Sequence, residues 1–157
     1  RKTKRDPESN IEKILDLGFV GEPESIKPDI FVTLEDTDII PVIAPLGIDD
    51  KGDTYNINAD TAAGAIASAL VAEKLIMLTD VSGILDQNNK LISQAKISEC
   101  KKLISQGIIS GGMIPKVETC ISSVNSSVES AHILNGKIPH VLLLEIFTEH
   151  GSGTMIV

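Results

Sequence analysis

Three groups of residues in this chain are of types that could bind a phosphate and help to transfer it. The first is Gly111-Gly112-Met113-Ile114-Pro115-Lys116, in which paired glycines and a lysine open a helical pattern. Glycines before a helix expose backbone N–H groups, and the helix N-terminus adds a partial positive charge, so the segment suits an anion such as phosphate. The alternative is a glycine turn at the start of an ordinary surface helix, because so short a motif often occurs by chance.

The other two groups supply carboxylates and amides at the ends of expected strands. Asn56, Asn58 and Asp60 open a helix of small residues, and Thr79, Asp80, Val81 and Gly83 follow an apolar strand. Together with the glycines and Lys116 they suit phosphoryl transfer, which depends on positioning and on charge stabilisation. The sequence has no GxxxxGK[ST] loop, no Ser-His-Asp signature and no clustered metal ligands. For Asn56 the alternative role is a helix cap.

The elements that must position these groups alternate along the chain. The apolar run 75–78 is typical of a buried parallel strand, and open α/β sheets bind ligands at the C-terminal ends of such strands. This alternation predicts an α/β fold with a mainly parallel sheet. Residues 1–10 are expected to form an arm or the end of a loop. We expect helices at 10–16, 27–38, 59–72, 97–106, 111–127 and 139–148, strands at 39–46, 75–78, 130–134 and 154–157, an extended piece at 19–21, and turns at 49–52, 88–90 and 135–136.

The composition narrows the class of protein. A chain of 157 residues with 42% hydrophobic residues can bury a core, filled by Ile, Leu, Val and Ala because aromatics are scarce. The net charge of −8 argues against nucleic acid or an anionic membrane as the main partner. Cys100 and Cys120 lie within helical patterns, which predicts buried, reduced thiols in a reducing compartment. Because the chain starts at Arg1 and not at Met, it is expected to be a fragment or a processed product.

Several segments, taken in order, resemble the amino acid kinase family. They are 56–63, 78–85 and 111–116, together with 17–21 and 151–156, so the resemblance runs over nearly the whole chain. The resemblance implies a three-layer αβα sandwich, with residues 1–64 as the remnant of an N-terminal amino-acid substrate lobe and 65–157 as a C-terminal ATP-binding lobe. The family's N-terminal phosphate loop, first catalytic lysine and substrate arginine have no counterpart, so this chain alone is expected to be nearly inactive.

The resemblance also implies a reaction and a set of roles. ATP would phosphorylate the γ-carboxylate of N-acetyl-L-glutamate, and Mg²⁺ would be held mainly by the ATP phosphates, with no metal site on the protein. Asn56 and Asn58 would contact the acyl-amino-acid substrate, Asp60 would fix the catalytic lysines, and Lys116 would stabilise the transferred phosphoryl group. The residues bordering ATP would be Thr79, Asp80, Val81, Gly83, Gly111, Gly112 and Met113.

A second site is implied near the C-terminus. His132, Glu145 and Gly151 resemble the arginine-binding residues of arginine-inhibited members, and Glu145 has the chemistry to pair with a guanidinium. The alternatives are a polar residue at a strand edge for His132 and a solvated helix position for Glu145. His140 and Tyr55 are interpreted as structural residues.

The resemblance further implies a dimer or a hexamer, a nitrogen-sensing signal protein as partner, and a location in the cytoplasm or the plastid stroma. Two rival functions stay open. One is another amino acid kinase of the glutamate 5-kinase or aspartokinase type, and the other is a non-catalytic module that binds a nucleotide or arginine.

Overall fold

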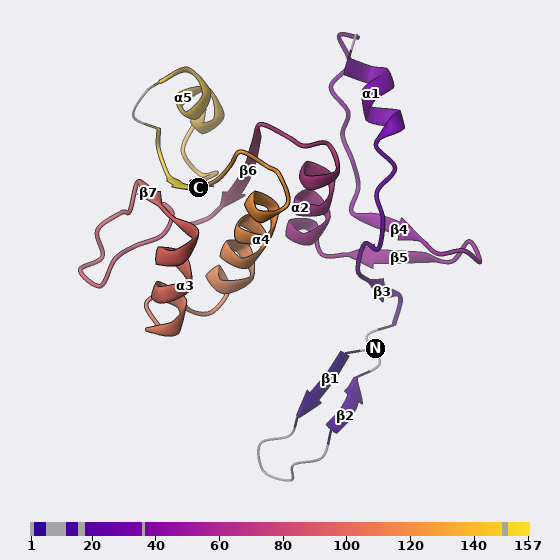
Figure 1. Cartoon of the computed structure of the whole chain (residues 1–157), viewed down its shortest axis with the longest axis horizontal. Helices are drawn as coiled ribbons and strands as arrows, with labels where there is room; N and C mark the ends of the chain where they lie inside the picture. The colour runs from indigo at the N-terminus through magenta and orange to yellow at the C-terminus, as the bar shows by residue number, and fades with distance from the viewer. Residues whose placement is uncertain (1, 6–11, 16–17, 36, 149–150) are drawn as a thin grey trace.

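A computed structural model describes residues 2–5, 12–15, 18–35, 37–148 and 151–157 of the chain (Figure 1). Strands and helices alternate through most of it, as the sequence predicts. In chain order the elements are β1 (Lys2–Arg5), β2 (Glu12–Leu15), β3 (Val20–Gly21), α1 (Asp29–Glu35), β4 (Leu46–Ile48), β5 (Thr54–Ile57), α2 (Ala59–Ala69), β6 (Lys74–Thr79), β7 (Gln94–Ala95), α3 (Ile97–Ser105), α4 (Met113–Asn125), β8 (Ser130–Asn135), α5 (Val141–Phe147) and β9 (Thr154–Ile156).

The strands form a four-stranded sheet and two smaller ones. In the four-stranded sheet the order is β6-β8-β9-β7. There β6 runs parallel to β8 and β7 parallel to β9, while β8 and β9 are antiparallel. A second sheet has the order β3-β5-β4, with β3 parallel and β4 antiparallel to β5, and β1 pairs with β2 as an antiparallel hairpin.

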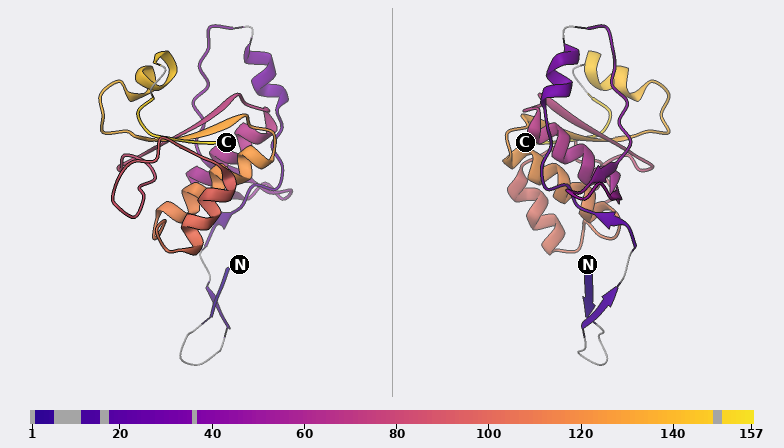
Figure 2. Two further views of the ribbon diagram at one scale, coloured as in Figure 1. Left: turned by 60° about the vertical axis from the view of Figure 1, so that its left-hand side comes forward. Right: turned by 90° about the vertical axis from the view of Figure 1, so that its right-hand side faces the viewer.

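Helices cover both faces of the four-stranded sheet. Figure 2 shows α2, α3 and α4 on one side of these strands and α5 on the other. The alternation of side chains along β8 agrees, because Ile133 belongs to the core that includes residues of α2 and α4, whereas its neighbour His132 contacts Glu145 of α5. The expected α/β fold with helices on both sides of a mainly parallel sheet is therefore confirmed.

The hydrophobic core lies between the four-stranded sheet and helices α2, α3 and α4. Apart from Met77, its strand residues are alanines or branched aliphatic side chains, and no aromatic ring takes part among the described residues. Both cysteines are in it, and the Cys120 sulfur lies 3.7 Å from that of Met77. The buried core side chains are Ala67, Leu75, Met77, Ile84, Ala95, Cys100, Ile109, Val117, Cys120, Ile121, Val128, Ala131, Ile133 and Ile156.

Helix α2 lies very close to α4 because its contact face carries small residues. At Gly64, a Cβ atom would come within 2.5 Å of Thr119 Cγ2 and 3.0 Å of Ser123 Oγ. The contacts of Asp60 with Lys116 and of Gly64 with Thr119 also show that the two helices run in the same direction. The N-termini of α2 and α4 are therefore neighbours.

Two N-terminal segments differ from the sequence-based expectation. The helix predicted at 10–16 is wrong over 12–15, which form β2, because backbone pairing with β1 outweighs the helical spacing of the apolar residues; residues 10, 11 and 16 lie outside the described part. The expected arm likewise contains strand β1 at 2–5, and residues 1 and 6–10 are not described.

The strand predicted at 39–46 begins only at Leu46. Pro41 and Pro45 remove two N–H donors from this run, so a continuous ladder of hydrogen bonds is not available to it. Strand β7 was not expected, since two residues are too short to give a pattern. None of the helices in the described residues is long and apolar enough to cross a membrane.

We expect Gly64→Ala to lower the free energy of unfolding, measured by chemical denaturation. The clash with Thr119 costs about 1–3 kcal/mol, against a gain of about 1 kcal/mol for replacing a helical glycine by alanine. The double variant Gly64→Ala/Thr119→Ala removes the clashing methyl group and should recover most of the loss relative to Thr119→Ala alone. A more stable Gly64→Ala single variant would contradict the close packing of α2 on α4.

The two cysteines should be inert in the folded protein. Burial raises the pKa of the Cys120 thiol to about 12, with the nearby Asp60 carboxylate acting in the same direction, and burial also raises the pKa of Cys100. Because the thiolate is the reactive form, a maleimide at pH 8 should label neither thiol in buffer and both in guanidinium chloride. Rapid labelling of the folded chain, followed by mass spectrometry, would contradict this burial.

Candidate functional site

An ion pair joins the first turns of α2 and α4. The Lys116 ammonium donates to both carboxylate oxygens of Asp60, at 2.8 Å from Nζ to Oδ2 and 3.1 Å to Oδ1. The two side chains are 23% and 27% exposed, so the pair is sheltered and still accessible from solvent. The structure thus brings together the two residues that the sequence analysis assigned to catalysis.

Local sequence determines where both helices start. The Asn58 Oδ1 accepts a hydrogen bond of 3.1 Å from the Thr61 N–H, which caps α2 one residue before Ala59. In α4 the N-cap is Gly112, and Pro115 lies in the first turn, where its missing N–H costs nothing. Asp60 and Lys116 are each placed by a helix start that the sequence encodes.

The Gly111-Gly112 turn next to Lys116 is open. Gly111 has φ +57°, a conformation that favours glycine, and a Cβ on either glycine would meet nothing within 4 Å. The Met113 and Ile114 N–H groups donate to the Ser110 and Gly111 carbonyls, both at 3.3 Å. The dipole of α4 and the ammonium of Lys116 place partial and full positive charge at one end of the helix pair. This end can receive an anion.

The two amides of the second group lie on different elements, Asn56 on β5 and Asn58 at the cap of α2. Asn56 is an exposed residue of β5, opposite Val20 of β3 and Leu46 of β4. Asn58, not Asn56, is the helix cap, because α2 begins at Ala59 and not at residue 56. Both amides precede Asp60 in the first turn of α2, as the sequence indicated.

The residues after β6 form a loop beside β8. Thr79 Oγ1 lies 3.4 Å from Asp80 Oδ1, and the Thr79 carbonyl accepts a hydrogen bond of 2.8 Å from the Gly136 N–H. The exposed Asp80 carboxylate is 4.0 Å from the Lys137 ammonium. Val81 is also exposed. Asp80 and Val81 therefore have accessible side chains at the C-terminal end of a parallel strand.

Gly83 and Met113 are placed by packing. A Cβ on Gly83, whose φ is +136°, would lie 2.6 Å from Thr154 Oγ1. The Thr154 hydroxyl accepts a hydrogen bond from the Ile84 N–H at 2.8 Å and donates to the Ile92 carbonyl at 2.7 Å, so this end of the loop is fastened to β9. Met113 is partly buried against the hydrophobic core.

A second polar cluster lies between β8 and α5. His132 Nδ1 is 2.6 Å from Glu145 Oε1, and the other carboxylate oxygen accepts the Ser152 N–H at 2.9 Å. Gly151 has φ +53°, and a Cβ there would come within 2.9 Å of Glu145 Oε2. The side chains of His132 and Glu145 are only 5% and 9% exposed, so the interpretation of Glu145 as a solvated helix residue is wrong.

Sequence reasoning missed two members of this cluster. Ser130 Oγ lies 2.9 Å from His132 Nε2, and the two residues share a face of β8 because they are two positions apart. Ser152 contributes its N–H, while its buried hydroxyl has no hydrogen-bond partner among the described residues. The spacing of Ser130 and His132 was a usable signal, whereas the contact of Ser152 depends on how the chain folds back after α5.

Tyr55 and His140 were interpreted as structural residues, and Tyr55 has local partners. The Tyr55 hydroxyl donates to Asp49 Oδ2 at 3.2 Å, and its ring lies 5.8 Å from that of Phe19. This hydrogen bond to Asp49 raises the pKa of the Tyr55 hydroxyl. His140 has φ +58° and is the residue before α5. The contacts of Tyr55 agree with its structural interpretation, and the structural interpretation of His140 stays a prediction.

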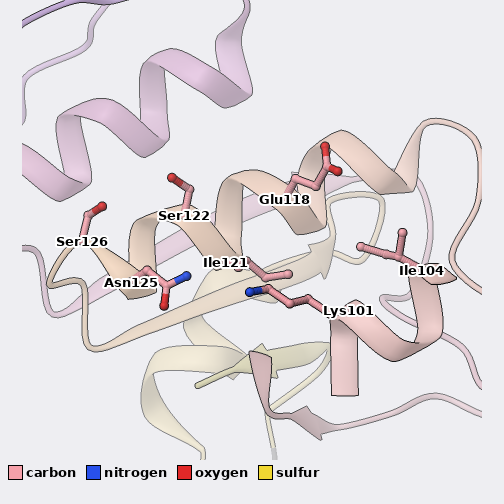
Figure 3. Close-up of a pocket in the computed structure, with 7 residues that line it drawn as sticks. All are labelled: Lys101, Ile104, Glu118, Ile121, Ser122, Asn125 and Ser126. Atoms are coloured by element: carbon pink, nitrogen blue, oxygen red, sulfur yellow. The ribbon is translucent and has the colours of Figure 1, made fainter. Parts of the chain in front are cut away.

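Neither of two hollows on the surface is lined by Lys116 or Asp60. A groove of about 410 Å³ lies between α3 and α4. Figure 3 shows Lys101 and Ile104 on α3 facing residues of α4. A larger cavity of about 850 Å³ is bordered by β3, α1, β4, β5 and the start of α2. In the described part of the chain, no three His, Cys, Asp or Glu side chains come together to hold a metal ion.

This chain is similar in sequence to known proteins of one family. The model of the amino acid kinase family matches residues 5–135. Curated relatives named acetylglutamate kinase include those of Parvibaculum lavamentivorans, 60% identical over 151 residues, and Mesorhizobium japonicum, 57% identical over 157 residues. The matches cover 96% and 100% of this chain and 50% and 53% of the relatives, so the chain spans about half of their length.

A solved structure shares the fold closely. The N-acetylglutamate synthase from Neisseria gonorrhoeae, complexed with coenzyme A and L-arginine, superposes with a TM-score of 0.85 at 27% identity. The superposition covers 91% of this chain and 33% of that one. The described elements therefore form a unit that also occurs within a longer protein.

Removing the Glu145 carboxylate should destabilise the protein. Glu145→Ala leaves the Ser152 N–H and the His132 Nδ1 atom without their partner, which costs about 1–3 kcal/mol of the free energy of unfolding. Glu145→Gln keeps an acceptor for Ser152 and should cost less. The matched control is Glu118→Ala, at an exposed position of α4, with an expected change within about 0.5 kcal/mol. Equal urea midpoints for Glu145→Ala and Glu118→Ala would show that the cluster adds no stability.

Proposed function

Because this chain belongs to the amino acid kinase family, we propose that it is the ATP-binding part of an acetylglutamate kinase. In this reaction a γ-carboxylate oxygen of N-acetyl-L-glutamate attacks the γ-phosphorus of ATP. The bond from that phosphorus to the bridging oxygen breaks, and ADP leaves with the electron pair. The products are an acyl phosphate and ADP. The curated relatives are twice as long as this chain, and the proposal concerns the activity of the protein of which these residues form part.

The observation that carries the proposal is the Lys116–Asp60 pair at the adjoining N-termini of α2 and α4. Asp60 holds the Lys116 ammonium at one position, so little reorganisation is needed when negative charge grows on the phosphoryl oxygens. The open Gly111-Gly112 turn adds backbone N–H donors beside it. Positioned charge of this kind is the main contribution that a protein makes to phosphoryl transfer.

The remaining assignments follow the same scheme. Thr79, Asp80, Val81 and Gly83 border the nucleotide from the end of β6, and Gly111, Gly112 and Met113 border it from the start of α4. The exposed amides of Asn56 and Asn58 contact the acyl-amino-acid. Mg²⁺ arrives with ATP and is held mainly by the phosphate oxygens, which neutralises charge during the transfer.

The proposed lobes meet within one helix. Residues 1–64 contain the β3-β5-β4 sheet and residues 65–157 the four-stranded sheet, in keeping with a substrate part and an ATP part. The boundary falls inside α2, so this helix belongs to both. A cytoplasmic or plastid location suits two buried free thiols.

A second candidate function is binding of L-arginine at His132, Glu145 and Gly151. It is favoured by the buried Glu145 carboxylate, which can pair with a guanidinium, and by the L-arginine in the similar synthase from Neisseria gonorrhoeae. A ligand there would compete with the His132 and Ser152 contacts of Glu145. The dimer or hexamer and the nitrogen-sensing signal protein remain predictions from the family resemblance.

We expect Mg-ATP to bind the chain in isothermal titration calorimetry, and Lys116→Ala to weaken that binding about tenfold or more, since a charge-assisted contact to phosphate is lost. Lys90→Ala removes the same charge from an exposed turn and should leave the affinity unchanged. Equal affinities of both variants would exclude Lys116 from the nucleotide site.

A parallel titration with L-arginine separates the second candidate from the first. A heat of arginine binding that is absent in Glu145→Gln but present in Lys116→Ala would assign arginine to the polar cluster between β8 and α5. Arginine binding in the absence of any ATP binding would favour the regulatory module over the kinase.

A further inference from the structure

Two side chains of opposite charge line the groove between α3 and α4 and do not pair with each other. They are Lys101 of α3 and Glu118 of α4, and both are exposed. In the described part of the chain neither side chain makes an ion pair or a hydrogen bond. Both charges are therefore available to a ligand.

The two charges lie at different places along the groove. Figure 3 shows the Lys101 side chain extending toward Asn125, while Glu118 lies on the side of Ile104. Glu118 and Asn125 are seven positions apart on α4, which is about 10 Å along the helix axis. The groove thus has a positive group toward one end and a negative group toward the other.

Between these charges the floor of the groove is apolar. Ile121 of α4 is 7% exposed, and Ile104 of α3 packs against the hydrophobic core. The short side chains of Ser122 and Ser126 do not fill the space above this floor, and a hollow of about 410 Å³ remains. A hollow of this size, with an apolar floor and a few polar groups around it, is typical of sites for small molecules.

We propose that this groove binds a small linear molecule with a carboxylate at one end, an ammonium at the other and an aliphatic chain between them. This is the class of the ω-amino acids. The carboxylate pairs with Lys101 and accepts a hydrogen bond from the amide of Asn125, and the ammonium pairs with Glu118. The aliphatic chain covers Ile121, which favours binding because apolar surface is removed from water.

The charges of the groove select among molecules of similar length. A dicarboxylate places its second carboxylate near Glu118 and a diamine places one ammonium near Lys101, so each meets a charge of its own sign. The ω-amino acid meets an opposite charge at both ends. Neither Lys116 nor Asp60 lines the groove, so this site is separate from the proposed nucleotide site.

The test titrates the full chain with 6-aminohexanoate, hexanoate or adipate and follows the methyl signals of Ile104 and Ile121 by NMR. We expect 6-aminohexanoate to shift both signals with a Kd of about 1–10 mM, as is usual for so small a ligand. Hexanoate should bind about threefold more weakly, because one exposed ion pair is lost, and adipate more weakly still. Unshifted methyl signals would overturn the proposal, as would adipate binding as tightly as 6-aminohexanoate.

Variants tie the selectivity to the two charges. Lys101→Ala should weaken the binding of 6-aminohexanoate about threefold or more. The matched control Lys102→Ala removes the same charge from an exposed position of α3 that does not line the groove, and it should leave the Kd unchanged. Equal weakening by both variants would contradict a site at Lys101.

Reversal of the charge of Glu118 gives a test that loss of folding cannot imitate. In Glu118→Lys the far end of the groove is positive, so adipate should bind more tightly than 6-aminohexanoate. Circular dichroism checks that each variant is folded, and the order of the three ligands on the unmodified chain decides the matter where a variant is not. An unchanged order of the ligands in folded Glu118→Lys would overturn the proposal.

Discussion

The close parallel packing of α2 against α4 is the constraint on which the candidate site depends. Gly64 lets the two helix backbones approach, with Thr119 and Ser123 filling the space that a side chain would need. Because the helices run in the same direction, both N-termini lie at one end, and the macrodipoles add their positive ends there. Asp60 and Lys116 would otherwise be far apart, since they are 56 positions apart in the sequence.

Strand β8 connects this site to the polar cluster between β8 and α5. One face of the strand supplies Ala131 and Ile133 to the core that supports α4, and the other supplies Ser130 and His132 to the polar cluster with Glu145. Every residue from Ser130 to Leu134 is buried, so side chains on both faces are held by packing. A change of packing on one face of β8 that shifts its backbone therefore also shifts the side chains on the other face.

The sequence was sufficient where a feature is encoded locally. The start of α4 could be located from Gly111, Gly112 and Pro115, and β6 from its apolar run, because capping, proline placement and hydrophobicity act over a few residues. It was insufficient where distant segments decide the structure. Residues 12–15 became a strand by pairing with 2–5, and Ser152 joined Glu145 through the return of the chain after α5.

The anchoring of Thr154 has a consequence for the motion of the loop after β6. Its hydroxyl ties Ile84 and Ile92 to the last strand, while Thr79 is held to Gly136 at the other end. Only Asp80 to Gly83 lie between these two attachments. So short a span has no room for a swinging lid, and its adjustment to a ligand amounts to changes of a few backbone dihedral angles. Such dihedral adjustments take place in nanoseconds to microseconds, the range of small loop motions.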